Sequence, residues 1–164
     1  MKILLLEDGV CAESLKGFLS DCSVEVVNNL LDFDCLLYEE PGVQAYGLVL
    51  MDLQIDMPYI GPQELIECIP EMKGFEQNTV FGLHLLGLDY LHSKVLNHPI
   101  TKGCVKEKFY LISGHAQLLK RKKIFETRQI DFSLEHLLDK GQEDYAELLK
   151  RLVNKLRPTP EETR

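Results

Sequence analysis

The sequence lacks the features that would place the protein in a membrane or on nucleic acid. No apolar run reaches the length of a transmembrane span. The first apolar run, residues 3–6, stops at two acids and is too short for the core of a secretory signal. Lys and Arg number 18 against 26 Asp and Glu, which gives a net charge of -8. We therefore expect no membrane association, no nucleic-acid partner and a cytoplasmic location.

The five cysteines form neither a disulfide framework nor a zinc motif. Their number is odd and no Cys-x-x-C pair occurs, so we expect reduced thiols. Histidines and cysteines do occur in the middle of the chain, but no spacing matches a known set of metal ligands. These residues are His84, His92, His98, Cys68 and Cys104.

What is present is the composition of a soluble globular protein. Hydrophobic residues make up 45% of the 164 residues and charged residues 27%. This length suits one compact domain. We expect that domain over residues 1–157, with a flexible tail at residues 158–164 and no internal repeat.

Short apolar runs alternate along the chain with segments of helical periodicity. This alternation predicts a mainly parallel sheet with helices on both faces. The expected strands are residues 3–6, 24–27, 48–51, 109–112 and 136–138. Helices are expected at residues 11–22, 30–37 and 145–156. The boundary of the fifth strand stays open, because residues 130–134 also alternate in hydrophobicity.

Residues 56–104 interrupt the alternation and must contain more than one helix. We expect helices at residues 63–72 and 79–97. The second is apolar around much of its circumference and must bury two faces. Either residues 61–74 pack over it, or it forms a homodimer contact.

Polar residues follow the expected strands at the points where the strands end. Glu7 and Asp8 follow the first strand and Asp52 follows the third. Ser113 follows the fourth strand and Lys140 the fifth. The carboxyl ends of parallel strands share one edge of a sheet, so these side chains should surround one crevice. Clustered carboxylates favour Mg²⁺, and a lysine and a hydroxyl suit a phosphoryl group.

Four segments carry a more specific resemblance. KILLLEDG, LVLMDLQ, FYLISGHA and LLDKG resemble the signature blocks of response-regulator receiver domains, in the same order. The resemblance covers nearly the whole chain outside residues 56–104. It implies a doubly wound α/β fold with a five-stranded parallel sheet in the flavodoxin-like order 2-1-3-4-5. Residues 56–104 would then form a long helical insertion between the third and fourth strands.

The resemblance also implies a role for each residue at the strand ends. Asp52 would accept a phosphoryl group, and Ser113 and Lys140 would contact its oxygens. Mg²⁺ would be bound by carboxylates and one main-chain carbonyl, from Glu7, Asp8, Asp52 and Gln54. The chain would be a stand-alone receiver rather than an enzyme. It would take its phosphoryl group from a sensor histidine kinase or a phosphotransfer domain and act on an unknown output protein.

Three features depart from the family pattern and keep other functions open. Met57-Pro58 lies two residues further from Asp52 than usual, the insertion is long, and Leu137 replaces a frequent aromatic residue. The insertion and Leu137 favour a receiver-like interaction module that does not use phosphorylation. A Mg²⁺-dependent phosphohydrolase is a third interpretation, but such enzymes usually carry a second acid where this chain has Gln54. The basic run at residues 120–123 is interpreted as a solvated helix face.

Overall fold

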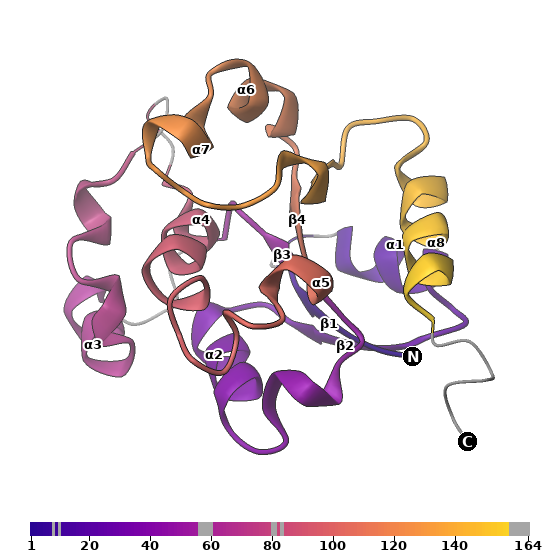
Figure 1. Ribbon diagram of the computed structural model, residues 1–164, viewed down its shortest axis with the longest axis horizontal. Helices are drawn as coiled ribbons and strands as arrows, with labels where there is room; N and C mark the ends of the chain where they lie inside the picture. The colour runs from indigo at the N-terminus through magenta and orange to yellow at the C-terminus, as the bar shows by residue number, and fades with distance from the viewer. Residues whose placement is uncertain (8, 10, 56–60, 80–81, 83, 158–164) are drawn as a thin grey trace.

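The chain forms an α/β structure around one parallel sheet. The computed structural model describes residues 1–7, 9, 11–55, 61–79, 82 and 84–157. Five strands pair in the order β2-β1-β3-β4-β5, and every pairing is parallel (Figure 1). The strands are β1 (Lys2–Leu6), β2 (Ser23–Val27), β3 (Leu48–Asp52), β4 (Phe109–Ser113) and β5 (Leu137–Asp139). The fold class and the strand order predicted from the sequence are confirmed.

Helices connect the strands and cover both faces of the sheet. The α-helices are α1 (Cys11–Phe18), α2 (Leu30–Tyr38), α3 (Pro62–Cys68), α4 (Leu86–Tyr90), α5 (Val105–Lys108), α6 (Ala116–Arg121), α7 (Ile124–Thr127) and α8 (Tyr145–Leu156). Short 3-10 helices occur at Gly42–Ala45, Pro70–Met72, Phe75–Gln77 and Leu134–His136, and a π-helix at Leu91–Val95 follows α4. No helix in the described ranges combines the length and apolar character needed to cross a bilayer.

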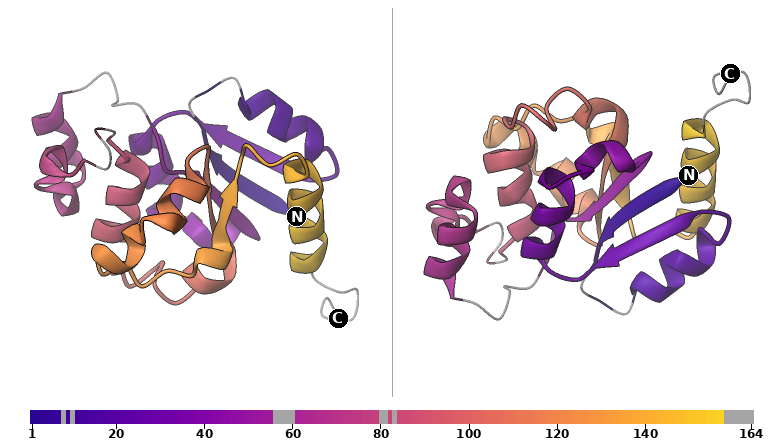
Figure 2. Two further views of the ribbon diagram at one scale, coloured as in Figure 1. Left: turned by 90° about the horizontal axis from the view of Figure 1, so that it is seen from above. Right: turned by 90° about the horizontal axis from the view of Figure 1, so that it is seen from below.

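Alternation along the strands divides the core into two layers. In β1, Ile3 and Leu5 face α1 and α8, whereas Leu4 and Leu6 face α2 and the insertion. Figure 2 shows α1 and α8 side by side on one face of the sheet and the remaining helices on the other. All five residues of β3 are buried, as expected for a central strand covered on both faces.

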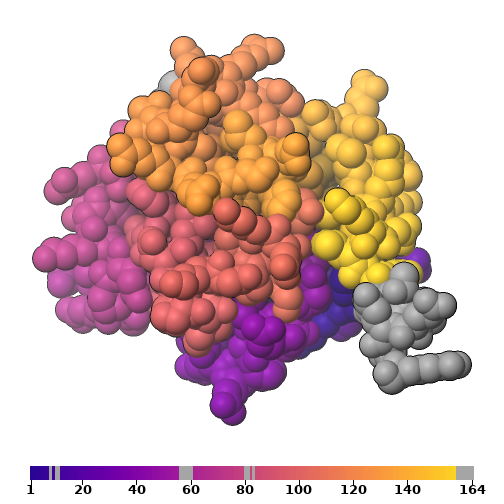
Figure 3. All heavy atoms as spheres, viewed as in Figure 1, coloured from indigo at the N-terminus to yellow at the C-terminus, as the bar shows by residue number. Residues whose placement is uncertain are grey.

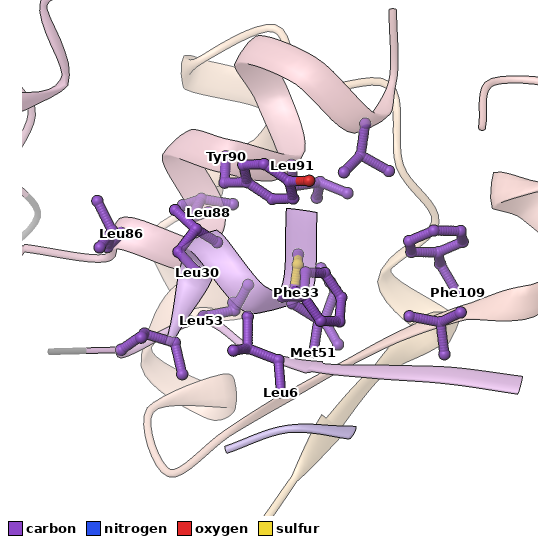
Figure 4. Packing of buried hydrophobic residues seen from close by; sticks show 14 of the residues in the cluster. Leu6, Leu30, Phe33, Met51, Leu53, Leu86, Leu88, Tyr90, Leu91 and Phe109 are labelled. Atoms are coloured by element: carbon purple, nitrogen blue, oxygen red, sulfur yellow. The ribbon is translucent and has the colours of Figure 1, made fainter. Parts of the chain in front are cut away.

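The insertion between β3 and β4 packs against itself and against the sheet. The segment containing α3 supplies buried apolar side chains to the same cluster as α4 and the π-helix. From that segment these are Leu65, Ile69, Met72 and Phe75. Figure 4 shows Leu88, Tyr90 and Leu91 on the same side as Leu30, Phe33 and Met51, with Leu86 at the edge of this cluster. The packing of residues 61–74 over the second helix is therefore confirmed, and a homodimer through residues 79–97 stays a prediction.

The predicted helical boundaries in the insertion were wrong at two places. The helix expected at residues 79–97 begins only at Leu86, because Gly82 has a φ of +76° and Leu85 is not helical. The helix expected at residues 63–72 ends at Cys68. Ile69 precedes Pro70, and the proline ring disfavours helical backbone at that position. β5 lies one residue later than expected, and residues 130–134 form no strand.

A buried polar network fixes the insertion to α2. Asp34 of α2 accepts a hydrogen bond from Tyr90 Oη at 2.7 Å and another from Lys94 Nζ at 3.0 Å. Lys94 is 8% exposed, and its ammonium also lies over the ring of Tyr38. Burial raises the pKa of Tyr90 well above its ordinary value, so the phenol stays a hydrogen-bond donor. Removing either charge of such a shielded ion pair leaves the other charge without a partner and destabilises the fold.

Candidate functional site

Glu7, Asp52 and Lys140 meet at the carboxyl edge of the sheet. Glu7 directly follows β1, Asp52 is the last residue of β3, and Lys140 directly follows β5. Lys140 Nζ donates to Glu7 Oε2 at 2.6 Å and also to Asp52 Oδ2. Both acids are 3% exposed. Three of the residues predicted from separate strand ends therefore share one ion cluster.

The main chain holds the second oxygen of each carboxylate. The N–H of Gly9 donates to Glu7 Oε1 at 3.2 Å, and the N–H of Gln54 donates to Asp52 Oδ1 at 3.1 Å. The other oxygen of each acid faces Lys140. This arrangement orients the two carboxylates toward one point, which the lysine ammonium occupies.

Burial and the lysine act on the Asp52 carboxyl in opposite directions. Burial raises the pKa of Asp52 to about 6, although the ammonium of Lys140 favours the carboxylate. Burial alone would lower the pKa of Lys140, but the charges of Asp52 and Glu7 outweigh it and raise that pKa. At neutral pH the cluster therefore contains a carboxylate on Asp52 and an ammonium on Lys140. A nucleophilic aspartate must be in this ionised form.

Ser113 lies at the same edge, on the neighbouring strand. It is the last residue of β4 and fully buried, and its main-chain oxygen accepts the N–H of Lys140 at 3.1 Å. Its hydroxyl oxygen accepts the N–H of His115 at 3.0 Å. The structure thus places Ser113 beside the main chain of Lys140, with its hydroxyl oxygen bound within its own loop. Asp8 and Met57-Pro58 lie outside the described residues.

The residues that are described fit a hard divalent cation. Glu7 and Asp52 already direct one oxygen each at a positive charge, and Mg²⁺ needs only one or two carboxylates besides water and phosphate oxygens. Gln54, whose main-chain carbonyl was expected as a ligand, lies two residues after Asp52 and is an exposed residue. Within the described ranges no three His, Cys, Asp or Glu side chains cluster as a metal site.

Gly87 is part of the site although the sequence interpretation did not include it. Its N–H donates to the main-chain oxygen of Leu53 at 3.1 Å. A Cβ at this position would overlap the main-chain oxygen of Asp52 and lie 3.0 Å from Leu53 Cα. The signal in the sequence was a glycine inside an apolar helical pattern, a position that often has a packing reason.

Two residues further on, Asp89 is another buried acid. It is 3% exposed and accepts a hydrogen bond from Arg128 Nη1 at 3.1 Å. Burial raises the pKa of Asp89 from an ordinary 3.8 to about 6, whereas Arg128, His84 and Asn78 favour the carboxylate. The side chain therefore changes charge in a pH range where most aspartates are already ionised.

We expect Asp89→Asn to change how stability depends on pH. An acid with a raised pKa in the folded state stabilises the fold below pH 3.8, and this contribution is lost as the pH rises through about 6. The pKa change corresponds to about 3 kcal/mol. As the pH rises from roughly 4.5 to 7.5, urea denaturation should therefore show a larger loss of stability in the wild type than in the variant.

The exposed Asp131 provides the control for this experiment, because its side chain is 93% exposed. Asp131→Asn should leave the pH profile of the wild type unchanged. An Asp89→Asn profile parallel to that of the wild type would contradict the assigned cause. The Asp52 carboxyl titrates in all three proteins and therefore cancels in the comparison.

Comparison with known proteins does not assign this chain to a family. No family model matches the chain, and a search of curated proteins found no match.

Proposed function

We propose that this protein is a response-regulator receiver that accepts a phosphoryl group on Asp52 in the presence of Mg²⁺. The observation that carries the proposal is the ammonium of Lys140 shared by the carboxylates of Glu7 and Asp52. These residues come from three separate strand ends. Their convergence at one edge is the arrangement that a cation and a phosphoryl group require together.

The proposed reaction uses each residue in a defined way. The Asp52 Oδ atom attacks the phosphorus of the donor, a P–O bond to Asp52 forms, and the bond to the leaving group breaks. Bound Mg²⁺ would neutralise charge on the transferred group. Lys140 is held at Asp52 in the starting state and would then contact a phosphoryl oxygen. Glu7 would remain as a cation ligand.

The partners follow from this chemistry. The donor would be a phosphohistidine of a sensor kinase or of a phosphotransfer domain in a two-component phosphorelay, in the cytoplasm. In this proposal the protein accepts one phosphoryl group on Asp52 from each donor and does not act as an enzyme with multiple turnovers. An output protein would distinguish the two states of Asp52, because phosphorylation adds charge beside a buried ion cluster.

Incubation with acetyl phosphate and Mg²⁺ tests this function. We expect intact-mass analysis to show one added phosphoryl group on the wild type. Asp52→Asn should show none, and a chelator should abolish the addition. Asp144→Asn changes an exposed acid at the start of α8 and should be labelled like the wild type. Equal labelling of Asp52→Asn, or no labelling of the wild type, would contradict the proposal.

A receiver-like interaction module is the second candidate. Leu137 favours it, since this side chain is buried in β5 and 1% exposed where receivers often carry a movable aromatic ring. Beryllofluoride with Mg²⁺ separates the candidates, because only a phosphate-accepting Asp52 should bind it. A phosphohydrolase would require turnover of a phosphomonoester that depends on Asp52. Gln54 provides no acid for protonating the leaving group.

A further inference from the structure

The insertion touches the Asp52 crevice directly. The start of α4 meets the main chain of Asp52 and Leu53, and Gly87 leaves no free space between the two backbones. α4 lies between α3 and the sheet in both sets of views (Figures 1 and 2). A shift of the Asp52–Leu53 main chain must therefore move α4, since close-packed backbones transmit displacement.

The other side of α4 is joined to the segment after α7. Arg128 Nη1 pairs with Asp89 at 3.1 Å, and Arg128 Nη2 donates to the main-chain oxygen of Thr79 at 3.4 Å. The side chain of Asp89 is 4% exposed and that of Arg128 21% exposed. An ion pair shielded to this extent is more than a surface contact. α4 is thus hydrogen-bonded to Leu53, next to Asp52, through Gly87 and paired with Arg128 through Asp89.

The end of α4 and the π-helix that follows it are held in place, so they cannot easily move with the start of α4. Tyr90 and Lys94 hold this segment to the half-buried Asp34 of α2 through a hydrogen bond and an ion pair. The backbone between them is a π-helix, a form frequently found at functional positions. A movement that begins at Gly87 is therefore directed toward Arg128 rather than toward α2.

α6 and α7 form a distinct surface beside α4. They follow Ser113 in the chain and lie above the insertion in the space-filling view (Figure 3). Leu118 is 36% exposed, and Arg121, Lys122 and Lys123 are exposed next to it. On a protein with a net charge of -8, these three cations form a local basic run beside one exposed leucine.

We infer that α4 couples the chemical state of Asp52 to the α6–α7 surface through Gly87 at one end and the Asp89–Arg128 ion pair at the other. The inference deepens the proposed function and rests on it. The pair is present in the unmodified protein, so it stabilises that state. Because coupling is reciprocal, removing the pair should favour the modified state.

Beryllofluoride with Mg²⁺ is the probe, with Arg128→Gln as the variant. We expect Arg128→Gln to bind beryllofluoride more tightly by on the order of fivefold. Hydrogen exchange of residues 124–128 should increase when the wild type binds the probe. In Arg128→Gln these amides should already exchange faster and should not respond to the probe. A merely structural role would neither tighten binding nor remove the response.

Two further variants make the experiment decisive. Asp89→Asn removes the same ion pair by changing the acid. It should also bind beryllofluoride more tightly and lose the exchange response, and it tests the inference even if Arg128→Gln does not fold. Lys123→Gln removes the exposed Lys123–Glu126 pair in the same segment, 3.6 Å in length, and should behave like the wild type.

The outcomes separate this inference from the proposed function. Two results would overturn the coupling but not the proposal that Asp52 accepts a phosphoryl group. In the first, the probe binds and hydrogen exchange at residues 124–128 does not change. In the second, Arg128→Gln and Asp89→Asn bind the probe with the affinity of the wild type. No binding of the probe to the wild type overturns both.

Discussion

Gly87→Ala should lower the free energy of unfolding by more than about 4 kcal/mol, or prevent folding. The added methyl group would overlap the main-chain oxygen of Asp52 and lie 3.0 Å from Leu53 Cα. Backbone atoms of a buried strand end cannot rotate away as a flexible side chain can. Relief therefore requires α4 to separate from β3, which breaks the hydrogen bond from Gly87 N to Leu53 O. Urea denaturation measures the loss directly.

Gly103→Ala is the matched control, because a Cβ at Gly103 would meet nothing within 4 Å. This variant should remain within about 0.5 kcal/mol of the wild type. If Gly87→Ala folds, its labelling by acetyl phosphate should also fall, since α4 supports the Asp52 main chain. A Gly87→Ala protein as stable as the wild type would show that α4 does not press on the crevice.

Lys140→Met should destabilise the protein by about 3 kcal/mol or more in the presence of a chelator. The side chains of Glu7 and Asp52 are 2% and 5% exposed, and without the lysine they lose their counter-charge. Labelling of Asp52 should also be lost, because no ammonium remains to contact the phosphoryl oxygens. Lys140→Arg keeps the charge and should recover stability more fully than labelling, since guanidinium geometry differs.

Added Mg²⁺ makes this variant informative about the cation site. If Glu7 and Asp52 bind the ion, Mg²⁺ should raise the melting temperature of Lys140→Met more than that of the wild type, where the lysine competes. A melting temperature that is equally insensitive to Mg²⁺ in both proteins would exclude the site. Lys150→Met, which breaks only an exposed pair with Glu147, should change stability by less than about 0.5 kcal/mol.

The candidate site could be predicted in part because strand ends are local features. A buried strand is a short apolar run, and the residue after it is visible in the sequence. In a parallel sheet those ends share an edge, so Glu7, Asp52 and Lys140 were expected together before their distance was known. Ser113 was placed at the correct edge, but the hydrogen bond of its hydroxyl oxygen to His115 N was not foreseen.

The insertion was predicted less well because its structure depends on long-range contacts. Apolar periodicity indicated one helix at residues 79–97, whereas the structure has α4 from Leu86 and then a π-helix. Gly87, near the start of α4, donates to Leu53, which directly follows β3 and lies 34 positions earlier in the chain. The pairing of Asp89 with Arg128, 39 residues apart, has no local signature either.

The sequence by itself determined the alternation of strands and helices, and with it the parallel sheet and the edge on which Asp52 lies. These follow from the periodicity of apolar residues, a property of neighbouring positions. Only the tertiary structure decided that Lys140 bridges Glu7 and Asp52, and that Gly87 joins the insertion to the crevice. Both contacts depend on the close packing of segments that lie far apart in the chain. A pattern of neighbouring residues carries no information about which distant segment will pack against it.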